Sequence, residues 1–217
     1  FHEARIESHL PNTIIPSRLI IAHLGNGASV TAVQNGISVD TTMGLTPCGG
    51  VLMGTRPGDL DPGLIFYLLR IHSTGAANAT DTVEHLLNKH SGMLALSGLS
   101  NDMRVLRSAA ADGNSQAKLA VEAFVLSVKK AIGGFIAIMG GLDALVFTGG
   151  IGEHDSLTRS QICSGLDAFG IQIDTCGNES SGTRLITRPQ SSVSAYVLPA
   201  EEGRMIAIHV ARMTTAS

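Results

Sequence analysis

The sequence predicts a mixed α/β fold, in which helices cover a sheet whose first strands run antiparallel. Three patterns lead to this prediction: an apolar run that ends in a glycine turn, an Asn-Gly pair between two strand-like segments, and later apolar runs that alternate with helical periodicity. The chain has 217 residues, of which 44% are hydrophobic. This length is sufficient for one domain with a sizeable core.

The first part of the predicted sheet is an antiparallel meander. Residues 19–24 form an apolar run of strand type that ends at the turn Gly25-Asn26-Gly27, and residues 28–34 form the second strand. The pair at 35–36, Asn-Gly, predicts a tight hairpin, because both central positions of a type I′ turn need positive φ. The chain then returns over residues 37–41 as a third strand.

A loop and three helices follow the meander. Residues 43–63 contain seven glycines or prolines before Asp61 and predict an ordered loop. Helices are predicted over 64–72 and 79–89, and Ser91-Gly92 ends the second of them. A long helix over 115–139 is predicted from one buried stripe with three- and four-residue spacing, formed by Leu119, Ala120, Ala123, Phe124, Ser127, Val128, Ala131 and Ile132.

The rest of the chain alternates strands with helices. A buried strand is predicted over residues 143–148, and a glycine turn over 149–152 leads into a helix over 155–169. A further strand over 193–198 and a final helix over 201–213 follow. Residues 1–18 contain two prolines and have weak periodicity, which predicts a frayed helix and a linker. The predicted domain therefore extends over residues 19–217.

The composition argues against several classes of function. Lys and Arg number 15 against 18 Asp and Glu, which leaves a net charge of −3 and no basic surface for nucleic acid. The longest apolar run, residues 131–142, contains four glycines and is shorter than the roughly 20 residues of a membrane-spanning helix. No signal peptide is recognised, and the three cysteines form neither a disulfide framework nor a zinc motif. We therefore expect a soluble protein of the reducing cytoplasm.

Three glycine-rich turns lie at predicted strand ends, at residues 23–29, 54–59 and 148–153. Glycines there allow backbone N–H groups to approach a phosphate, although each turn alone is also consistent with an ordinary connection. No lysine follows a glycine, which excludes a P-loop, and the spacing after Gly150 does not match a dinucleotide-binding fingerprint. The three turns together favour a nucleotide or phosphate site of another kind.

Five segments carry a resemblance to a known family. They are His-Leu-Gly-Asn-Gly-Ala-Ser at 23–29, Ser-Val-Asp-Thr-Thr-Met-Gly-Leu-Thr-Pro at 38–47, Met-Gly-Thr-Arg-Pro-Gly-Asp-Leu-Asp-Pro-Gly at 53–63, Asp-Met-Arg at 102–104 and Phe-Thr-Gly-Gly-Ile-Gly-Glu at 147–153. In this order they resemble the acetate kinase family of the sugar kinase, Hsp70 and actin superfamily. The chain resembles its second domain, a ribonuclease-H-like mixed sheet flanked by helices, and the family's N-terminal domain is absent from it.

The resemblance implies reversible transfer of the ATP γ-phosphoryl group to acetate or propionate, which gives an acyl phosphate and ADP. Arg56 and His23 would be the catalytic residues: His23 contacts the transferring group, and Arg56 stabilises the charge that develops on it. A carboxylate is itself a nucleophile, so no general base is needed. The residues implied to bind the nucleotide are His23, Gly25, Asn26, Gly27, Asp102, Met103, Arg104, Gly150, Ile151, Gly152, Glu153 and His154.

The resemblance also implies a Mg²⁺ ion and a partner. Glu202 would hold the Mg²⁺, with Glu201 as the alternative, and a homodimer is expected. The isolated chain is expected to bind nucleotide weakly and to turn over little, because the family's first domain supplies other groups of the site. Two further readings stay open: a non-catalytic nucleotide-binding regulatory module of the actin or Hsp70 type, and a structural dimerisation domain.

Several of these residues also have a purely structural interpretation. His23 at a strand end could be a hydrogen-bonded buried histidine, and Met103 is more typical of a packing residue. Asp59 and Asp61 are expected to stabilise turns rather than to take part in chemistry. Glu201-Glu202 could simply favour a helix N-terminus.

Overall fold

A computed structural model describes residues 16–73, 78–182 and 184–200 of the chain. Its six-stranded sheet has the order β3-β2-β1-β4-β6-β5. The strands are β1 (Arg18–Leu24), β2 (Ala28–Gln34), β3 (Ile37–Thr41), β4 (Ala144–Thr148), β5 (Arg184–Leu185) and β6 (Ser194–Val197). Because β1, β4 and β6 are parallel while β2 is antiparallel to both its neighbours, the predicted mixed sheet is confirmed.

The predicted meander is present with nearly the predicted boundaries. The type I′ turn places Asn35 at φ 51° and Gly36 at φ 79°, as the hairpin requires. The first strand begins one residue earlier than expected, at Arg18, whose guanidinium forms an ion pair with Asp143 just before β4. This pair joins the starts of two strands that are parallel neighbours in the sheet.

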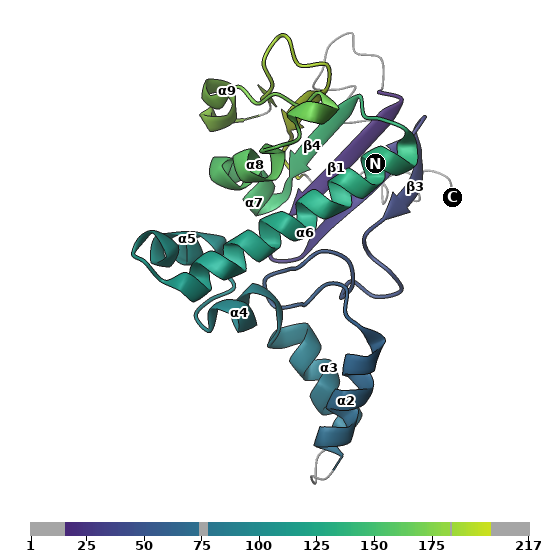
Figure 1. Ribbon diagram of the computed structural model, residues 1–217, viewed down its shortest axis with the longest axis vertical. Coiled ribbons are helices and arrows are strands. Elements are labelled where there is room, and N and C mark those ends of the chain that lie inside the picture. Colours follow the sequence, from purple (N-terminus) through teal and green to yellow (C-terminus); the bar gives the residue numbers. More distant parts are fainter. Residues whose placement is uncertain (1–15, 74–77, 183, 201–217) are drawn as a thin grey trace, which may run out of the picture.

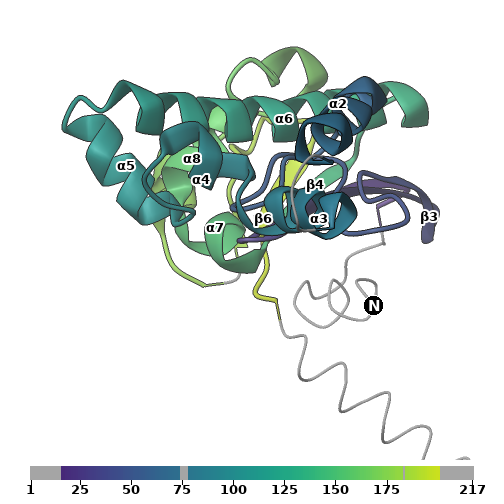
Figure 2. The same ribbon diagram turned by 90° about the horizontal axis from the view of Figure 1, so that it is seen from below.

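The helices are α2 (Pro62–His72), α3 (Ala79–Lys89), α4 (Gly92–Ser97), α5 (Met103–Ala111), α6 (Ser115–Met139), α7 (Gly149–His154), α8 (Ser156–Cys163) and α9 (Thr175–Glu179), with a 3₁₀ turn, η1, at Asp167–Phe169. Figure 1 shows α6 lying across the sheet and the pair α2–α3 projecting from the body of the domain. Figure 2 shows the same helix along one face of the strands.

Helix α6 packs its apolar side chains against the sheet and contributes ten buried residues to the core. Phe124, Val128 and Ile132 are fully buried, as the stripe predicts. The prediction for Leu119 is wrong, because its side chain is 52% exposed, while Val121 and Val125 are buried instead. The buried face is wider than one stripe because α4 and α5 also pack against this helix.

The segment after β4 differs from the sequence prediction. Residues 149–154 are not a plain turn but the short helix α7, and the predicted helix over 155–169 ends at Cys163. Asp155 separates the two helices, since its carboxylate accepts from the backbone N–H of Thr158 and caps α8. The predicted final helix over 201–213 and most of the predicted linker lie outside the described residues.

No helix in the described parts of the chain is both long and apolar enough to cross a membrane.

Candidate functional site

The candidate site lies at the carboxyl ends of two neighbouring parallel strands, β1 and β4. His23 on β1 is in register with Thr148 on β4, and each strand is followed at once by a glycine-rich turn. In open α/β sheets, ligands bind outside the carboxyl ends of the strands. The topology thus brings together two of the turns that lie more than 120 residues apart in the sequence.

A cleft of about 700 Å³ opens at this end of the sheet. It is lined by three separate segments that contain predicted site residues, namely the β1–β2 turn at residues 25–27, the start of α5 and the helix α7. The lining residues are Gly25, Asn26, Asn101, Asp102, Met103, Arg104, Arg107, Gly150, Ile151, His154, Asp155, Ser156 and Leu157. The structure therefore gathers eight residues of the predicted nucleotide set in one cleft.

Asn26 is held in the turn by neighbours from two other segments. Its backbone carbonyl accepts from the N–H of Gly54 at 2.9 Å, and its side-chain oxygen accepts from Asn101 Nδ2 at 2.8 Å. A Cβ atom on Gly54 would lie 2.0 Å from that oxygen, so only glycine permits this approach. The loop 53–59 is thus packed directly on the β1–β2 turn.

Arg56 lies next to the cleft rather than in its lining. Its Nη1 donates to the backbone carbonyl of Pro47 at 3.1 Å, and a Cβ atom on Gly27 would lie 3.4 Å from the same nitrogen. The guanidinium is therefore beside the β1–β2 turn, at the end of β1 that also carries His23. His23 itself is half-buried.

The loop that carries Arg56 is fixed by the start of α4, which the sequence analysis did not predict. The N–H groups of Met93 and Leu94 donate to the carbonyls of Met53 and Gly54, each at 2.9 Å. Gly92 has φ +66°, and a Cβ atom there would lie 2.3 Å from the Met53 carbonyl oxygen. Ser91-Gly92 therefore does more than end α3, because it also allows α4 to support the loop.

Glu153 does not reach into the cleft. Its Oε1 atom accepts from the N–H of Gly149 at 3.0 Å and from the N–H of Ala200 at 2.8 Å. This carboxylate links the start of α7 to the chain beyond β6, so the structure gives it a local structural role. Gly152 is a buried residue of α7, and its carbonyl accepts from Arg159 at 2.8 Å. A nucleotide contact by either residue stays a prediction.

The rim of the cleft at α5 contains an ion pair. The Asp102 carboxylate caps α5 by accepting from the Arg104 N–H at 2.8 Å and also pairs with the Arg104 guanidinium at 2.6 Å. These hydrogen bonds from Arg104 lower the pKa of Asp102 to about 2, because they stabilise the ionised carboxylate. Asp102 thus stays charged well below neutral pH. Met103 is buried in the core, which fits the packing role, although it also lines the cleft.

Some cleft residues were missed from the sequence. Arg107 pairs with Asp155 at 2.6 Å and donates to Thr158 Oγ1, and the two side chains of the pair are less than 20% exposed. The partners are separated by 48 residues, so no local spacing could have revealed them. Asp59 and Asp61 behave as expected: Asp59 accepts from the N–H of Gly50, and Asp61 caps α2.

The metal prediction cannot be compared with the structure, since Glu201 and Glu202 lie outside the described residues. Within residues 16–73, 78–182 and 184–200, no group of three or more His, Cys, Asp or Glu side chains could hold a metal ion.

The fold and the cleft define an α/β domain of the class that places its ligand site at the carboxyl ends of parallel strands. The acetokinase family model matches residues 1–208, and the chain belongs to this family. It is 46% identical to acetate kinase of Dictyoglomus thermophilum over 197 residues, which cover 90% of this chain and 48% of that protein. It is 48% identical to propionate kinase of Yersinia enterocolitica over 198 residues, with the same coverage of both proteins.

The solved structures agree with these relatives. The crystal structure of Porphyromonas gingivalis acetate kinase superposes with a TM-score of 0.88 and 39% identity, covering 100% of this chain and 53% of that chain. A propionate kinase structure from Francisella tularensis gives a TM-score of 0.81 at 40% identity, covering 95% and 50% respectively. The chain spans about half the length of the curated relatives it matches.

Proposed function

We propose that this chain is the nucleotide-binding half of an enzyme that transfers the ATP γ-phosphoryl group reversibly to a short-chain carboxylate, acetate or propionate. The observation that carries this proposal is the cleft in which the β1–β2 turn, the start of α5 and the helix α7 converge. Relatives named acetate kinase and propionate kinase match 90% of the chain. Acetate and propionate are therefore both proposed as phosphoryl acceptors.

The proposed binding mode follows the chemistry of the cleft. In this mode the adenosine would lie between Ile151 on α7 and the Asp102–Arg104 rim, which all line the cleft. The phosphates extend toward the Gly25–Gly27 turn, where the two glycines have no Cβ atom to keep a phosphate away from the backbone. The transferring group would then reach Arg56 and His23 at the end of β1. Arg56 suits this role because a guanidinium is always charged and offers several planar donors.

The acceptor needs no activation by a base. A carboxylate is ionised and nucleophilic near neutral pH, so the residues have to position it in line with the γ-phosphate and stabilise the charge on the equatorial oxygens. We propose that the acceptor pocket is formed mainly outside this chain, in the half of the family's length that the chain does not cover. That arrangement is consistent with the open cleft.

We propose Mg²⁺ as the metal, held by Glu202, with Glu201 as the alternative. Mg²⁺ usually binds one or two carboxylates together with substrate phosphates and water, so a single glutamate is sufficient. Support comes from Ala200, which Glu153 anchors next to α7 just before the two glutamates in the sequence. When bound, the ion would neutralise charge on the β- and γ-phosphates.

The isolated chain is expected to bind ADP weakly and to form little or no acetyl phosphate. A chimera that joins it to the amino-terminal half of the Dictyoglomus thermophilum enzyme is expected to restore turnover. Calorimetry would measure ADP binding, and trapping of the acyl phosphate with hydroxylamine would measure turnover. Ready formation of acetyl phosphate by the chain alone would contradict the prediction. Nucleotide binding without any turnover of the chimera would favour the regulatory module.

We further propose that the protein acts in the cytoplasm as a homodimer and that the projecting helix α2 forms part of the dimer contact. None of the α2 side chains is buried, yet Phe66 is 60% exposed, Tyr67 54% and Ile71 47%. An apolar surface of this kind favours a protein contact. A second copy is the proposed partner because the helix pair projects from the domain and would be free to meet its own symmetry mate (Figure 1).

Phe66→Glu is expected to convert the dimer to a monomer, because it would place a charge in the apolar contact. Light scattering after size-exclusion chromatography would measure the mass. Phe169→Glu is the matched control, since Phe169 is 48% exposed in η1, far from α2 in the sequence. A monomeric wild-type chain, or equal loss of the dimer in both variants, would contradict the proposed contact.

A further inference from the structure

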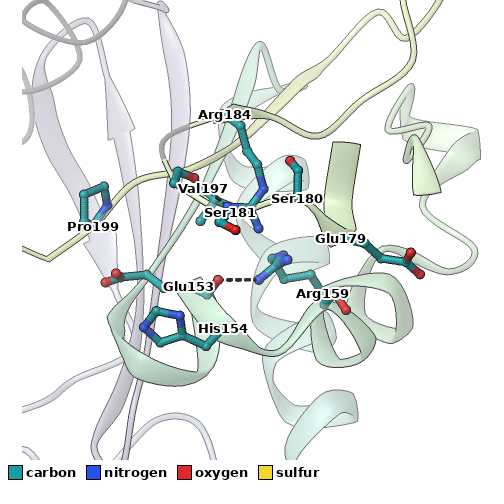
Figure 3. A pocket seen from close by; sticks show the side chains of 11 residues that line it. Glu153, His154, Arg159, Glu179, Ser180, Ser181, Arg184, Val197 and Pro199 are labelled. Atoms are coloured by element: carbon teal, nitrogen blue, oxygen red, sulfur yellow. Dashed lines mark hydrogen bonds between the residues drawn. The ribbon is translucent and has the colours of Figure 1, made fainter. Parts of the chain in front are cut away.

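A second pocket lies behind α7, next to the cleft. Its volume is about 410 Å³, and its walls come from the end of α7, the start of α8, the segment after α9 and the region around β6. His154 and Ser156 line both the pocket and the cleft. Figure 3 shows the guanidinium groups of Arg159 and Arg184 near the centre of this pocket.

Arg159 is a buried cation that is bound only to neutral groups. Its side chain is 1% exposed. It donates to the carbonyl oxygens of Gly152 and Glu153 at 2.8 and 3.0 Å, and to the side-chain and backbone oxygens of Asn178. These bonds use four of the five guanidinium N–H groups. One donor is left over within the described part of the chain.

Arg184 approaches the same pocket from β5. It donates to the backbone carbonyls of Gly177, Gly182 and Asn178. Two of its five N–H groups are not used in these bonds. The carbonyl of Asn178 accepts from both arginines, so the two guanidinium groups are held close together.

No carboxylate of the described residues forms an ion pair with either arginine. Glu153 and Glu179 line the pocket, but Figure 3 shows both carboxylates pointing away from the arginines. The Glu153 carboxylate is already bound by two backbone N–H groups. Asp155, whose charge also acts on Arg159, is paired with Arg107. Among residues 16–73, 78–182 and 184–200, the two positive charges of this pocket thus have no carboxylate bound to them.

The two charges also destabilise each other. Burial lowers the pKa of Arg159 to about 10, and the nearby positive charge of Arg184 adds to this effect. Burial likewise lowers the pKa of Arg184. Both shifts show that burial disfavours the protonated forms, and the charge of Asp155 offsets only part of this effect at Arg159. A negative ligand between the two groups would raise both pKa values.

We propose that this second pocket binds a small phosphate-type oxyanion between Arg159 and Arg184. Two guanidinium groups with spare N–H donors match the charge and the several acceptor oxygens of such a dianion. The pocket volume is ample for inorganic phosphate. Arg159 also donates to the carbonyls of Gly152 and Glu153 near the end of α7. An anion bound to Arg159 would therefore also stabilise the position of α7, the helix that lines the cleft. This last consequence rests on the proposed nucleotide function, whereas anion binding itself does not.

The test is a calorimetric titration of the chain with inorganic phosphate at constant ionic strength, with and without saturating ADP. Arg184→Gln is expected to raise the phosphate Kd at least about tenfold, which corresponds to loss of one hydrogen bond to a charged group. Arg184→Lys keeps the charge but loses the planar donors, so an intermediate Kd is expected. Arg188→Gln is the matched control, since Arg188 is exposed, donates from Nε to one backbone carbonyl and does not line the pocket.

Binding that persists with ADP and depends on Arg184 but not on Arg188 supports the second pocket. Equal weakening in the Arg184→Gln and Arg188→Gln variants would show an adventitious ion only and would overturn the proposal, as would the absence of any binding heat. Phosphate binding that disappears with ADP or in Arg56→Gln would place the anion in the cleft, which also overturns it. If ADP does not bind at all, the proposed nucleotide function fails while the Arg184 comparison still decides the anion site.

Discussion

Arg56→Ala is expected to lower the rate of phosphoryl transfer by roughly 10³-fold or more, the lower end of the range for an arginine that stabilises the transition state. The guanidinium lies beside the glycine turn at the end of β1, anchored by the Pro47 carbonyl. Charge on the equatorial oxygens grows only during transfer, so the effect should fall on kcat rather than on nucleotide affinity. The measurement is steady-state acetyl phosphate formation by the chimera, together with calorimetric ADP binding.

Arg70→Ala is the matched control, because Arg70 is an exposed arginine on α2, away from the cleft lining. It should leave kcat unchanged. Arg56→Lys should recover only part of the rate, since an ammonium group cannot present the same planar pair of donors. If Arg56→Ala instead raises KM for ATP with kcat unchanged, Arg56 serves in nucleotide binding and not in transition-state stabilisation.

Arg159→Met is expected to lower the free energy of unfolding by about 3–5 kcal/mol, since each buried acceptor left without a donor costs about 1–3 kcal/mol. The substitution removes the donors to the carbonyls of Gly152 and Glu153 and to the side-chain oxygen of Asn178 in one step, while the Asn178 carbonyl keeps its hydrogen bond from Arg184. The total stability of a domain is only about 5–15 kcal/mol, so this is a large fraction. Urea unfolding followed by circular dichroism would measure it, with an unchanged m-value confirming that both end states are comparable.

The control for this prediction is Arg188→Met. Arg188 is exposed, and its side chain donates one hydrogen bond, from Nε to the Ile173 carbonyl. Loss of this side chain should therefore change the free energy of unfolding by no more than about 0.5 kcal/mol. Arg159→Lys should be intermediate, because a lysine has three donors instead of five. A loss below about 1 kcal/mol for Arg159→Met would mean that water replaces the guanidinium at these carbonyls.

Local patterns predicted much of the fold. The β1–β2–β3 meander follows from the apolar run over 19–24 with its glycine turn and from the Asn35-Gly36 turn, whose backbone demands are local. The helices α3 and α6 have the predicted boundaries, because caps and helical periodicity operate within a few residues. The sequence also identified the β1–β2 turn at residues 25–27, the 102–104 segment and the α7 glycines as candidates for one site.

Contacts between distant segments account for what was not predicted. Ser91-Gly92 has the composition of a helix end, yet its positive φ serves the packing of α4 on the loop that carries Arg56. Glu153 belongs to a predicted nucleotide motif, yet its carboxylate binds backbone N–H groups at the start of α7 and in the segment after β6. A motif reports which residues occur near a site, but it does not report where their side chains point.

The sequence by itself determined the mixed α/β class, the meander and the long helix, because turn chemistry and periodicity are encoded over a few neighbouring residues. The family was indicated separately, by the resemblance of five ordered motifs. Only the tertiary structure decided which residues share the cleft, how Arg107 meets Asp155, and that two arginines face one pocket behind α7. The physical reason is separation along the chain. Ion pairs and buried carbonyl–guanidinium contacts act through space over about 3 Å, and the sheet order that brings their partners together is set by packing of the whole core.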